Sequence, residues 1–276
     1  MKLKQIIAAV LAAAMMTAMT ACNSNGGEQS QSGSEPSQSQ SEGESESSDG
    51  KKFKVGVIQL VEHDALNAAT QGDNVEIVVQ NASGDSPTCG VIANQFVSEG
   101  VDLIMANATP ALQAAAAATG TIPIVGTSVT DYATALQISD WTGKTGTNIT
   151  GTADLAPLSE QAAMIKELFP EAKKVGILFC SAEPNSAYQA NVIKEQLSSL
   201  GIESEEFTFA DTNDVAAVTT TACGACDVLY IPTDNTAASC TETINNVAQP
   251  AGVPIVAGEA GICSGCGVAT LSISYY

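Results

Sequence analysis

Six short polar segments carry most of the side chains of this sequence that could bind a ligand, and each follows a predicted β-strand. Hydroxyl, carboxamide, carboxylate and imidazole groups dominate them, and such groups suit a small polar molecule. The segments are 61–63 (VEH), 107–110 (NATP), 127–131 (TSVTD), 181–186 (SAEPNS), 233–236 (TDNT) and 258–261 (GEAG). In open parallel sheets, ligands bind at the carboxyl ends of the strands, where helix N-termini also point. We therefore expect these segments to line one cleft between two lobes. Helix capping by the same residue types remains an alternative for any single residue.

The elements expected to position these segments alternate between β-branched strands and alanine-rich helices from Lys51 onward. This alternation is typical of parallel α/β units. Strands are predicted at 54–60, 75–80, 102–106, 122–125, 174–180, 205–210, 227–232, 253–257 and 268–273. Helical stretches are predicted at 88–98, 110–118, 159–168, 187–200 and 237–248. The pattern predicts an α/β fold.

Three blocks of the chain occur twice in the same order. KVGVIQL from Lys54 matches KVGILFC from Lys174, and VDLIMANAT from Val101 matches CDVLYIPTD from Cys226. IPIVGTSV from Ile122 likewise matches VPIVAGEA. An ordered repeat of this kind predicts two Rossmann-like lobes, each a parallel sheet flanked by helices, at residues 51–150 and 151–276.

Residues 1–22 have the composition of an export signal, with two lysines followed by an apolar run. Their ending, MTAC, resembles the bacterial lipobox, in which the cysteine, here Cys22, is lipidated and becomes the mature N-terminus. An ordinary secretion signal is the alternative. Residues 23–50 contain no large apolar side chain and are rich in Ser, Gln and Glu, so we expect a disordered tether.

The formal net charge is −20, from 30 acidic and 10 basic side chains, and every basic residue is a lysine. Nucleic-acid binding relies on clustered Lys and Arg, so this composition argues against it. Without arginine, a ligand carboxylate would have to be held by hydroxyls, backbone N–H groups and helix N-termini.

The blocks VGVIQLVEHDAL, VDLIMANATPALQAAA, IPIVGTSVTD, YIPTDNTAAS and VPIVAGEAGI resemble the ABC-type substrate-binding lipoproteins that include tryptophan- and tyrosine-binding proteins. The resemblance implies a periplasmic-binding-protein-like type I fold that closes around a small solute, such as an amino acid, aromatic ones included. It further implies that the protein has no enzymatic activity and no cofactor. The solute would be delivered to an ABC permease with its ATPase, and the protein would be lipid-anchored on the extracytoplasmic face of the cell membrane. A sensory receptor module without a transport role is the alternative.

The resemblance also implies a set of ligand-binding residues. These are Glu62, His63, Asn107, Thr109, Ser128, Thr130, Asp131, Glu183, Asn185, Asp234, Asn235 and Glu259. In this set, Asp234 or Glu259 would pair with an ammonium group. Thr109, Ser128 or Thr130 would donate hydrogen bonds to a carboxylate.

Two departures from the family pattern follow from the sequence. The first crossover, residues 61–74, is close to the minimum length for joining parallel strands, whereas family members usually carry a longer helix there. The chain stops at LSISYY, so the C-terminal lobe is expected to be truncated relative to the family.

CGAC at 223–226 and CSGC at 263–266 form two C-x-x-C motifs, each preceding a predicted strand. We expect them at the sheet end opposite the cleft, as small buried thiols or one or two disulfides, with a structural metal as the less favoured alternative. His63 belongs to no sequence motif of a catalytic nucleophile or a metal site. It is therefore predicted to contact a ligand or begin a helix. No metal and no catalytic residue are expected.

Overall fold

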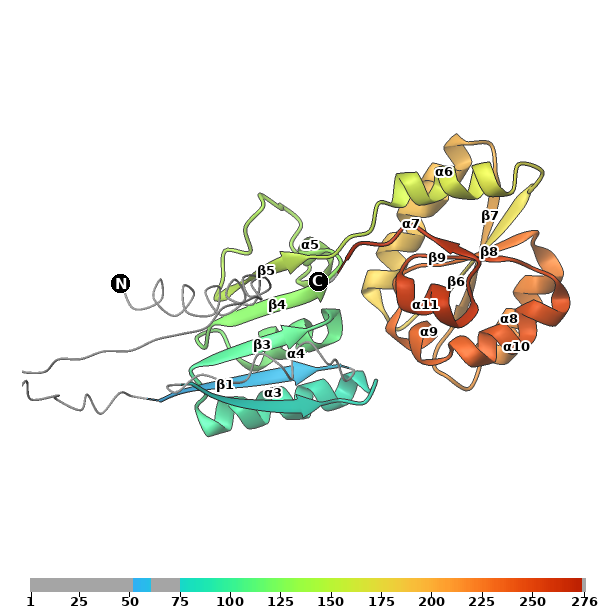
Figure 1. Ribbon diagram of the computed structural model, residues 1–276. Coiled ribbons are helices and arrows are strands. Elements are labelled where there is room, and N and C mark those ends of the chain that lie inside the picture. Colours follow the sequence, from blue (N-terminus) through green and yellow to red (C-terminus); the bar gives the residue numbers. More distant parts are fainter. Residues whose placement is uncertain (1–51, 61–74, 275–276) are drawn as a thin grey trace, which may run out of the picture. The chain divides into compact units, whose positions relative to one another are not determined.

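The computed structural model describes residues 52–60 and 75–274, which form two five-stranded sheets with helices packed against them (Figure 1). The predicted α/β fold of two parallel sheets flanked by helices is confirmed. The predictions for residues 1–51, with Cys22, and for residues 61–74, with Glu62 and His63, lie outside the described residues. None of the helices within the described ranges is long and apolar enough to cross a bilayer.

The first sheet has the strand order β2-β1-β3-β4-β5. Its strands are β1 (Phe53–Gln59), β2 (Val75–Asn81), β3 (Leu103–Asn107), β4 (Ile124–Val129) and β5 (Ile149–Ala153). Its helices are α3 (Ser86–Glu99), α4 (Thr109–Ala118) and the short α5 (Tyr132–Ala135). The pairings β1–β3, β3–β4 and β4–β5 are parallel, so the carboxyl ends of these strands share one edge.

Helices α3 and α4 pack side by side and against the first sheet. The core there includes Ile58, Phe96, Ile104 and Leu112, all fully buried. Gly56 lets α3 approach β1, because a Cβ at this position would come within 2.6 Å of the Phe96 ring. The packing of an aromatic ring on a glycine therefore sets the distance between this helix and the sheet.

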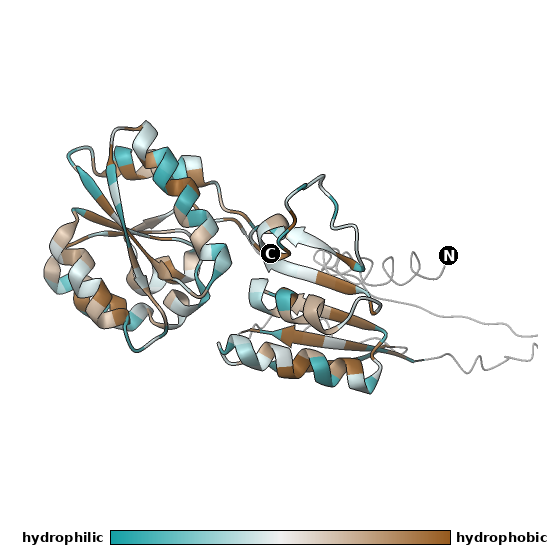
Figure 2. Ribbon diagram, turned by 180° about the vertical axis from the view of Figure 1, so that it is seen from behind, coloured by the Kyte–Doolittle hydropathy of each residue, from teal (hydrophilic) through white to brown (hydrophobic). Residues whose placement is uncertain are grey.

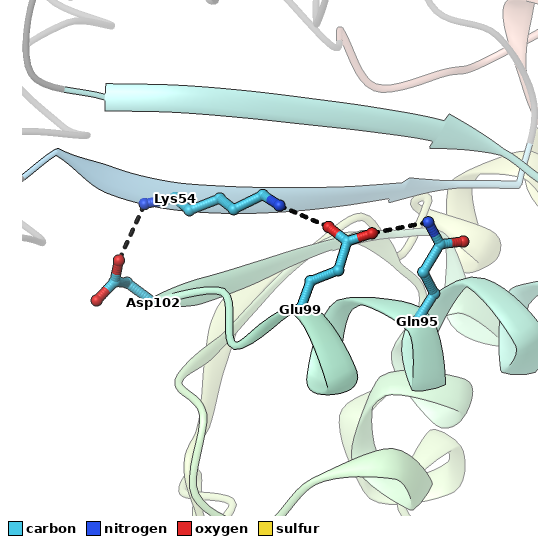
Figure 3. Close-up of polar contacts among 4 residues, drawn as sticks. All are labelled: Lys54, Gln95, Glu99 and Asp102. Carbon is cyan, nitrogen blue, oxygen red and sulfur yellow. Dashed lines mark hydrogen bonds and ion pairs between the residues drawn. The ribbon is translucent and has the colours of Figure 1, made fainter.

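Lys54 ties the start of β1 to α3 and to the turn before β3 (Figure 3). Its backbone N–H donates to Asp102 Oδ2 at 2.9 Å, and its Nζ lies 2.6 Å from Glu99 Oε2. Glu99 Oε1 also accepts a hydrogen bond from Gln95 at 2.8 Å. The ion pair is partly exposed, so it contributes little to the stability of the fold.

The second sheet has the strand order β10-β9-β8-β6-β7, and its pairings are all parallel. Its strands are β6 (Lys174–Cys180), β7 (Glu203–Phe209), β8 (Val228–Ile231), β9 (Ile255–Ala257) and β10 (Ala269–Thr270). Its helices are α6 (Leu158–Leu168), α7 (Pro184–Ser199), α8 (Val215–Ala225), α9 (Asn235–Ser239), α10 (Thr241–Ala251) and α11 (Ala260–Cys266).

Helices cover both faces of the second sheet. One apolar cluster joins α6 and α7 to one face, and a second joins α8, α10 and α11 to the other (Figure 1). Strands β6 and β8 are buried along most of their length and are coloured as hydrophobic in Figure 2. Burial on both faces explains why these strands read as continuous apolar runs in the sequence.

Four elements were not predicted, namely α5, β5, α8 and α11, and the strand predicted at 122–125 lies further along, at Ile124–Val129. Strand β5 was missed because it is exposed after Ile149 and lacks an apolar alternation. Helix α8 was missed because its Val and Thr residues favour strands, yet burial of one helical face overrides that preference. Helix α11 was missed because its two glycines and two cysteines give no helical signal.

Gly151 gives a test of the packing in the first sheet. It pairs with Gly126 across β4 and β5, and a Cβ at Gly151 would overlap both the Tyr132 hydroxyl and the Gly126 carbonyl oxygen. Gly151→Ala should therefore lower the free energy of unfolding by about 1–3 kcal/mol, measured by urea denaturation. The matched control is Gly224→Ala in α8, where a Cβ would meet no atom within 4 Å. That change should be neutral or stabilising by up to about 1 kcal/mol. Equal urea midpoints for Gly151→Ala and the wild type would contradict this account.

Candidate functional site

Two residues other than glycine adopt positive φ angles at the carboxyl ends of neighbouring strands in the first sheet. Ala108, after β3, has a φ of 82°, and Ser128, near the end of β4, has a φ of 55°. The Ala108 N–H donates to the Thr127 carbonyl at 3.0 Å, which joins the two strand ends. Such conformations cost roughly 1–3 kcal/mol each and cluster at ligand-binding sites. They mark this edge of the sheet as the candidate site.

Hydroxyl groups at the same edge have no hydrogen-bond partner within the part of the chain that the structure describes. Thr109, the first residue of α4, is 3% exposed, and Thr130 is 4% exposed. Ser128, near the end of β4, is half-buried. The N-cap of α4 is Ala108, which offers no side-chain acceptor, and the first turn of the helix has no acidic residue. This edge therefore presents hydroxyl donors and a helix N-terminus of positive partial charge.

Asp131 and Glu259 are helix caps in the structure. The Asp131 carboxylate accepts from the Thr134 N–H at 2.7 Å and begins α5. Glu259 accepts from the Gly261 N–H at 2.6 Å and from the Ile262 N–H, and begins α11. The capping alternative raised from the sequence thus describes both positions, and ligand contact by either stays a prediction.

Glu183 organises the carboxyl end of the second sheet. It is 4% exposed, and its carboxylate accepts five hydrogen bonds. The backbone N–H groups of Asn235 and Thr236 donate at 3.0 and 2.8 Å, and the side chains of both residues donate at 2.6 and 2.8 Å. Asn185 Nδ2 is the fifth donor, at 3.1 Å. Five donors compensate much of the cost of burying this charge.

Asp234 lies beside Glu183 and is 1% exposed. Its oxygens accept from the Cys180 and Ala237 N–H groups, each at 2.7 Å, so it caps α9 and ties β8 to β6. Burial, reinforced by the neighbouring Glu183 charge, raises the pKa of Asp234 to about 7. No ion pair to a lysine reaches either carboxyl group among the described residues. Asp234 therefore holds a proton at mildly acidic pH.

The loop after β8 is fixed by Gln189, which the sequence prediction missed, together with Ser186 and the predicted Asn185. Gln189 is fully buried, and its amide pairs with the Thr233 peptide in both directions, donating at 3.0 Å and accepting at 3.2 Å. Ser186 and Asn185 also donate to the Thr233 carbonyl, at 3.4 Å each. These residues stand one helical turn apart on α7, and this i, i+3 and i+4 spacing of polar side chains was the available signal.

The predicted site residues thus fall into two groups. Asn107, Thr109, Ser128, Thr130 and Asp131 gather at the ends of β3 and β4 in the first sheet. Glu183, Asn185, Asp234 and Asn235 form one hydrogen-bonded network at the ends of β6 and β8, and Glu259 follows β9.

The C-x-x-C motifs precede β8 and β10, as expected from the sequence. The seven described cysteines are free thiols, and no three metal-binding side chains converge within the described ranges. Burial raises the pKa of Cys266 to about 12, and it raises the pKa values of Cys223, Cys226 and Cys263 as well. Such thiols are poor nucleophiles, which argues against a redox role.

Comparison with known proteins agrees with the fold of two parallel sheets flanked by helices. The family model for ABC transporter substrate binding proteins matches residues 54–276. The tyrosine-binding protein of Clostridioides difficile (strain R20291) is 34% identical over 287 residues, covering 99% of this chain and 79% of that protein. A crystal structure of an ABC domain in complex with L-Trp, from Streptococcus pneumoniae, is 31% identical, with a TM-score of 0.76 over 81% of this chain and 80% of that one. A leucine-binding protein from Thermotoga maritima, 17% identical, shares the fold, with a TM-score of 0.57 over 78% of this chain and 67% of its own.

Asp234 gives a prediction for the pH dependence of stability. An unfolded Asp titrates near 3.9, so the native state binds this proton more tightly than the unfolded state does. The stabilisation of the native state by this bound proton is complete below about pH 4 and is lost as the pH rises towards about 7. In urea denaturation from pH 4 to 8, the wild type should lose stability relative to Asp234→Asn by up to about 1.4 kcal/mol per pH unit.

Asp227 serves as the control of opposite sign. Hydrogen bonds from the Lys173 and Lys174 N–H groups hold its pKa below the usual value. Its contribution is therefore present above the unfolded pKa and is lost as the pH falls, so Asp227→Asn should not reproduce the trend of Asp234→Asn. A pH-independent difference between the wild type and Asp234→Asn would show that Asp234 titrates normally.

Proposed function

This chain belongs to the family of ABC transporter substrate-binding proteins, and we propose that it binds an amino acid, with aromatic ones the leading class. In this proposal the two groups of strand-end residues face one cleft, and the bound solute is delivered to a membrane permease. The names of the relatives support the ligand class, since one is a tyrosine-binding protein and another is a complex with L-Trp.

The observation that carries the proposal is the chemical contrast between the two groups. The first-sheet group offers the Thr109, Ser128 and Thr130 hydroxyls and the N-terminus of α4, which are donors without an acceptor among the described residues. Its one carboxylate, Asp131, caps α5, whereas the second-sheet group holds three carboxyl groups. A zwitterion matches this contrast, because its carboxylate needs donors and its ammonium group is favoured near Asp234 or Glu259.

The remaining parts of the proposal concern the setting of the protein. Cys22 carries a lipid that anchors the chain on the extracytoplasmic face of the cell membrane, and residues 23–50 act as the tether. The MTAC sequence and the apolar-free composition of 23–50 support this. The partners are the permease and ATPase subunits of an ABC importer. Glu62 and His63, in the segment after β1, complete the proposed ligand-binding set.

Ligand binding is tested by thermal denaturation in the presence of candidate solutes. A ligand at one hundred times its dissociation constant stabilises the native state by about 2.7 kcal/mol. L-Trp or L-Tyr should therefore raise the melting temperature by several degrees, whereas glucose should leave it unchanged. A cooperative melt that no amino acid shifts would contradict the proposed ligand class.

The carboxylate-binding role of the first-sheet group is tested by Thr109→Val, which removes the hydroxyl and keeps the shape. Loss of one hydrogen bond to a charged group should weaken binding of the amino acid by roughly 10- to 100-fold, measured by titration calorimetry. Thr220→Val is the control, since the Thr220 hydroxyl is exposed and bonds only to the Ala216 carbonyl of its own helix. If both variants bind as the wild type does, the hydroxyl of Thr109 is not part of the site.

A further inference from the structure

The carboxamide of Asn185 is bonded at one end and unpartnered at the other. Its Nδ2 donates to Glu183 Oε2 at 3.1 Å, to Ser186 Oγ at 3.3 Å and to the Thr233 carbonyl at 3.4 Å. Its Oδ1 is buried and accepts no hydrogen bond from any described residue. The side chain as a whole is 5% exposed. Asn185 Oδ1 is therefore an acceptor without a donor among the described residues.

The orientation of this carboxamide is fixed by its neighbours. A Glu183 carboxylate and a backbone carbonyl can only accept hydrogen bonds, so the end facing them must be the NH2 group. Because the two ends of a planar carboxamide point in different directions, Oδ1 faces away from Glu183 and Thr233. Leaving such an acceptor buried without a donor is unfavourable, and buried polar atoms in proteins are normally bonded. Among the described residues no donor reaches it, so a donor from outside them would remove this cost.

The charges around Asn185 favour a positively charged donor. Glu183 and Asp234 are both buried close by, and the ion pairs found in the described part of the chain lie elsewhere, at Lys54, Lys174 and Lys194. Glu183 already accepts five hydrogen bonds, and each Asp234 oxygen accepts one from a backbone N–H group. The acidic groups thus supply the negative potential, while Asn185 Oδ1 supplies the free acceptor.

We infer that Asn185 Oδ1 accepts a hydrogen bond from the ammonium group of the ligand, an assignment that rests on the proposed function. Asn185 is then the residue that selects amine-bearing ligands over ligands that carry only a carboxylate. Asp234 and Glu259 act through their charge and as helix caps, without direct contact with the ammonium group. Asn185 is uncharged. Its oxygen can therefore accept a hydrogen bond from a cation without adding another buried charge to the protein.

The test compares each amino acid with its des-amino analogue. Affinities for L-Tyr and 3-(4-hydroxyphenyl)propionate, and for L-Trp and 3-indolepropionate, are measured by calorimetry at one pH. The wild type should prefer the amino acid. In Asn185→Ala this preference should shrink by roughly 10- to 100-fold, because only the amino acid loses a hydrogen bond to a charged group. Gln189→Ala is the matched control: it also removes a buried amide bonded to Thr233, but that amide has no free acceptor. Gln189→Ala should change the affinity for the amino acid and the affinity for its des-amino analogue by the same factor.

Each outcome decides one question. An unchanged preference in Asn185→Ala would overturn the inference, since Oδ1 would then be bonded to buried water, and would leave the proposed function intact. A wild type that binds neither amino acid would contradict the proposed function itself. If Asn185→Ala does not melt cooperatively, Asn185→Ser, which also lacks the carboxamide oxygen, is measured for the same preference.

Discussion

Parallel pairing of neighbouring strands is the constraint on which both groups of candidate residues depend. In a parallel sheet every strand ends at the same edge, so polar segments far apart in the chain are collected there. Asn107 and Thr127 lie opposite each other at the ends of β3 and β4, and the ends of β6 and β8 are joined through Asp234. The apolar side chains of the strands form the core, and the polar residues that follow the strands lie at the edge where a ligand could bind.

The lack of arginine gives the two groups their different character. In the first-sheet group, the groups that could hold an anion are hydroxyls and a helix N-terminus, and two residues beside them adopt positive φ angles. In the second-sheet group, buried carboxylates have no cationic partner among the described residues and are satisfied by N–H and side-chain donors instead. The result is one edge with spare donors and another with negative potential, a combination suited to a zwitterion.

Capping and binding compete for the same residue types, and the structure separates them position by position. Asp131, Asp234 and Glu259 all begin helices, so their carboxylates already have backbone partners. Thr109 and Thr130 have none among the described residues, although they come from segments of similar composition. A polar segment after a strand therefore indicates a candidate ligand-binding site. The segment alone does not show which of its residues keeps a free hydrogen-bonding group.

The sequence by itself determined the fold class and the duplication of the α/β unit, because these depend on periodicity and block order. The family was indicated by the resemblance of its sequence blocks to known members. The sequence also located the strand ends to within a few residues. Only the tertiary structure decided which polar groups satisfy one another. Glu183 meets Asn235 across 52 residues and Gln189 meets Thr233 across 44, and no local pattern encodes such pairings. The free oxygen of Asn185 follows from them, since a hydrogen-bonding group is recognised as unpaired only when all its neighbours in space are known.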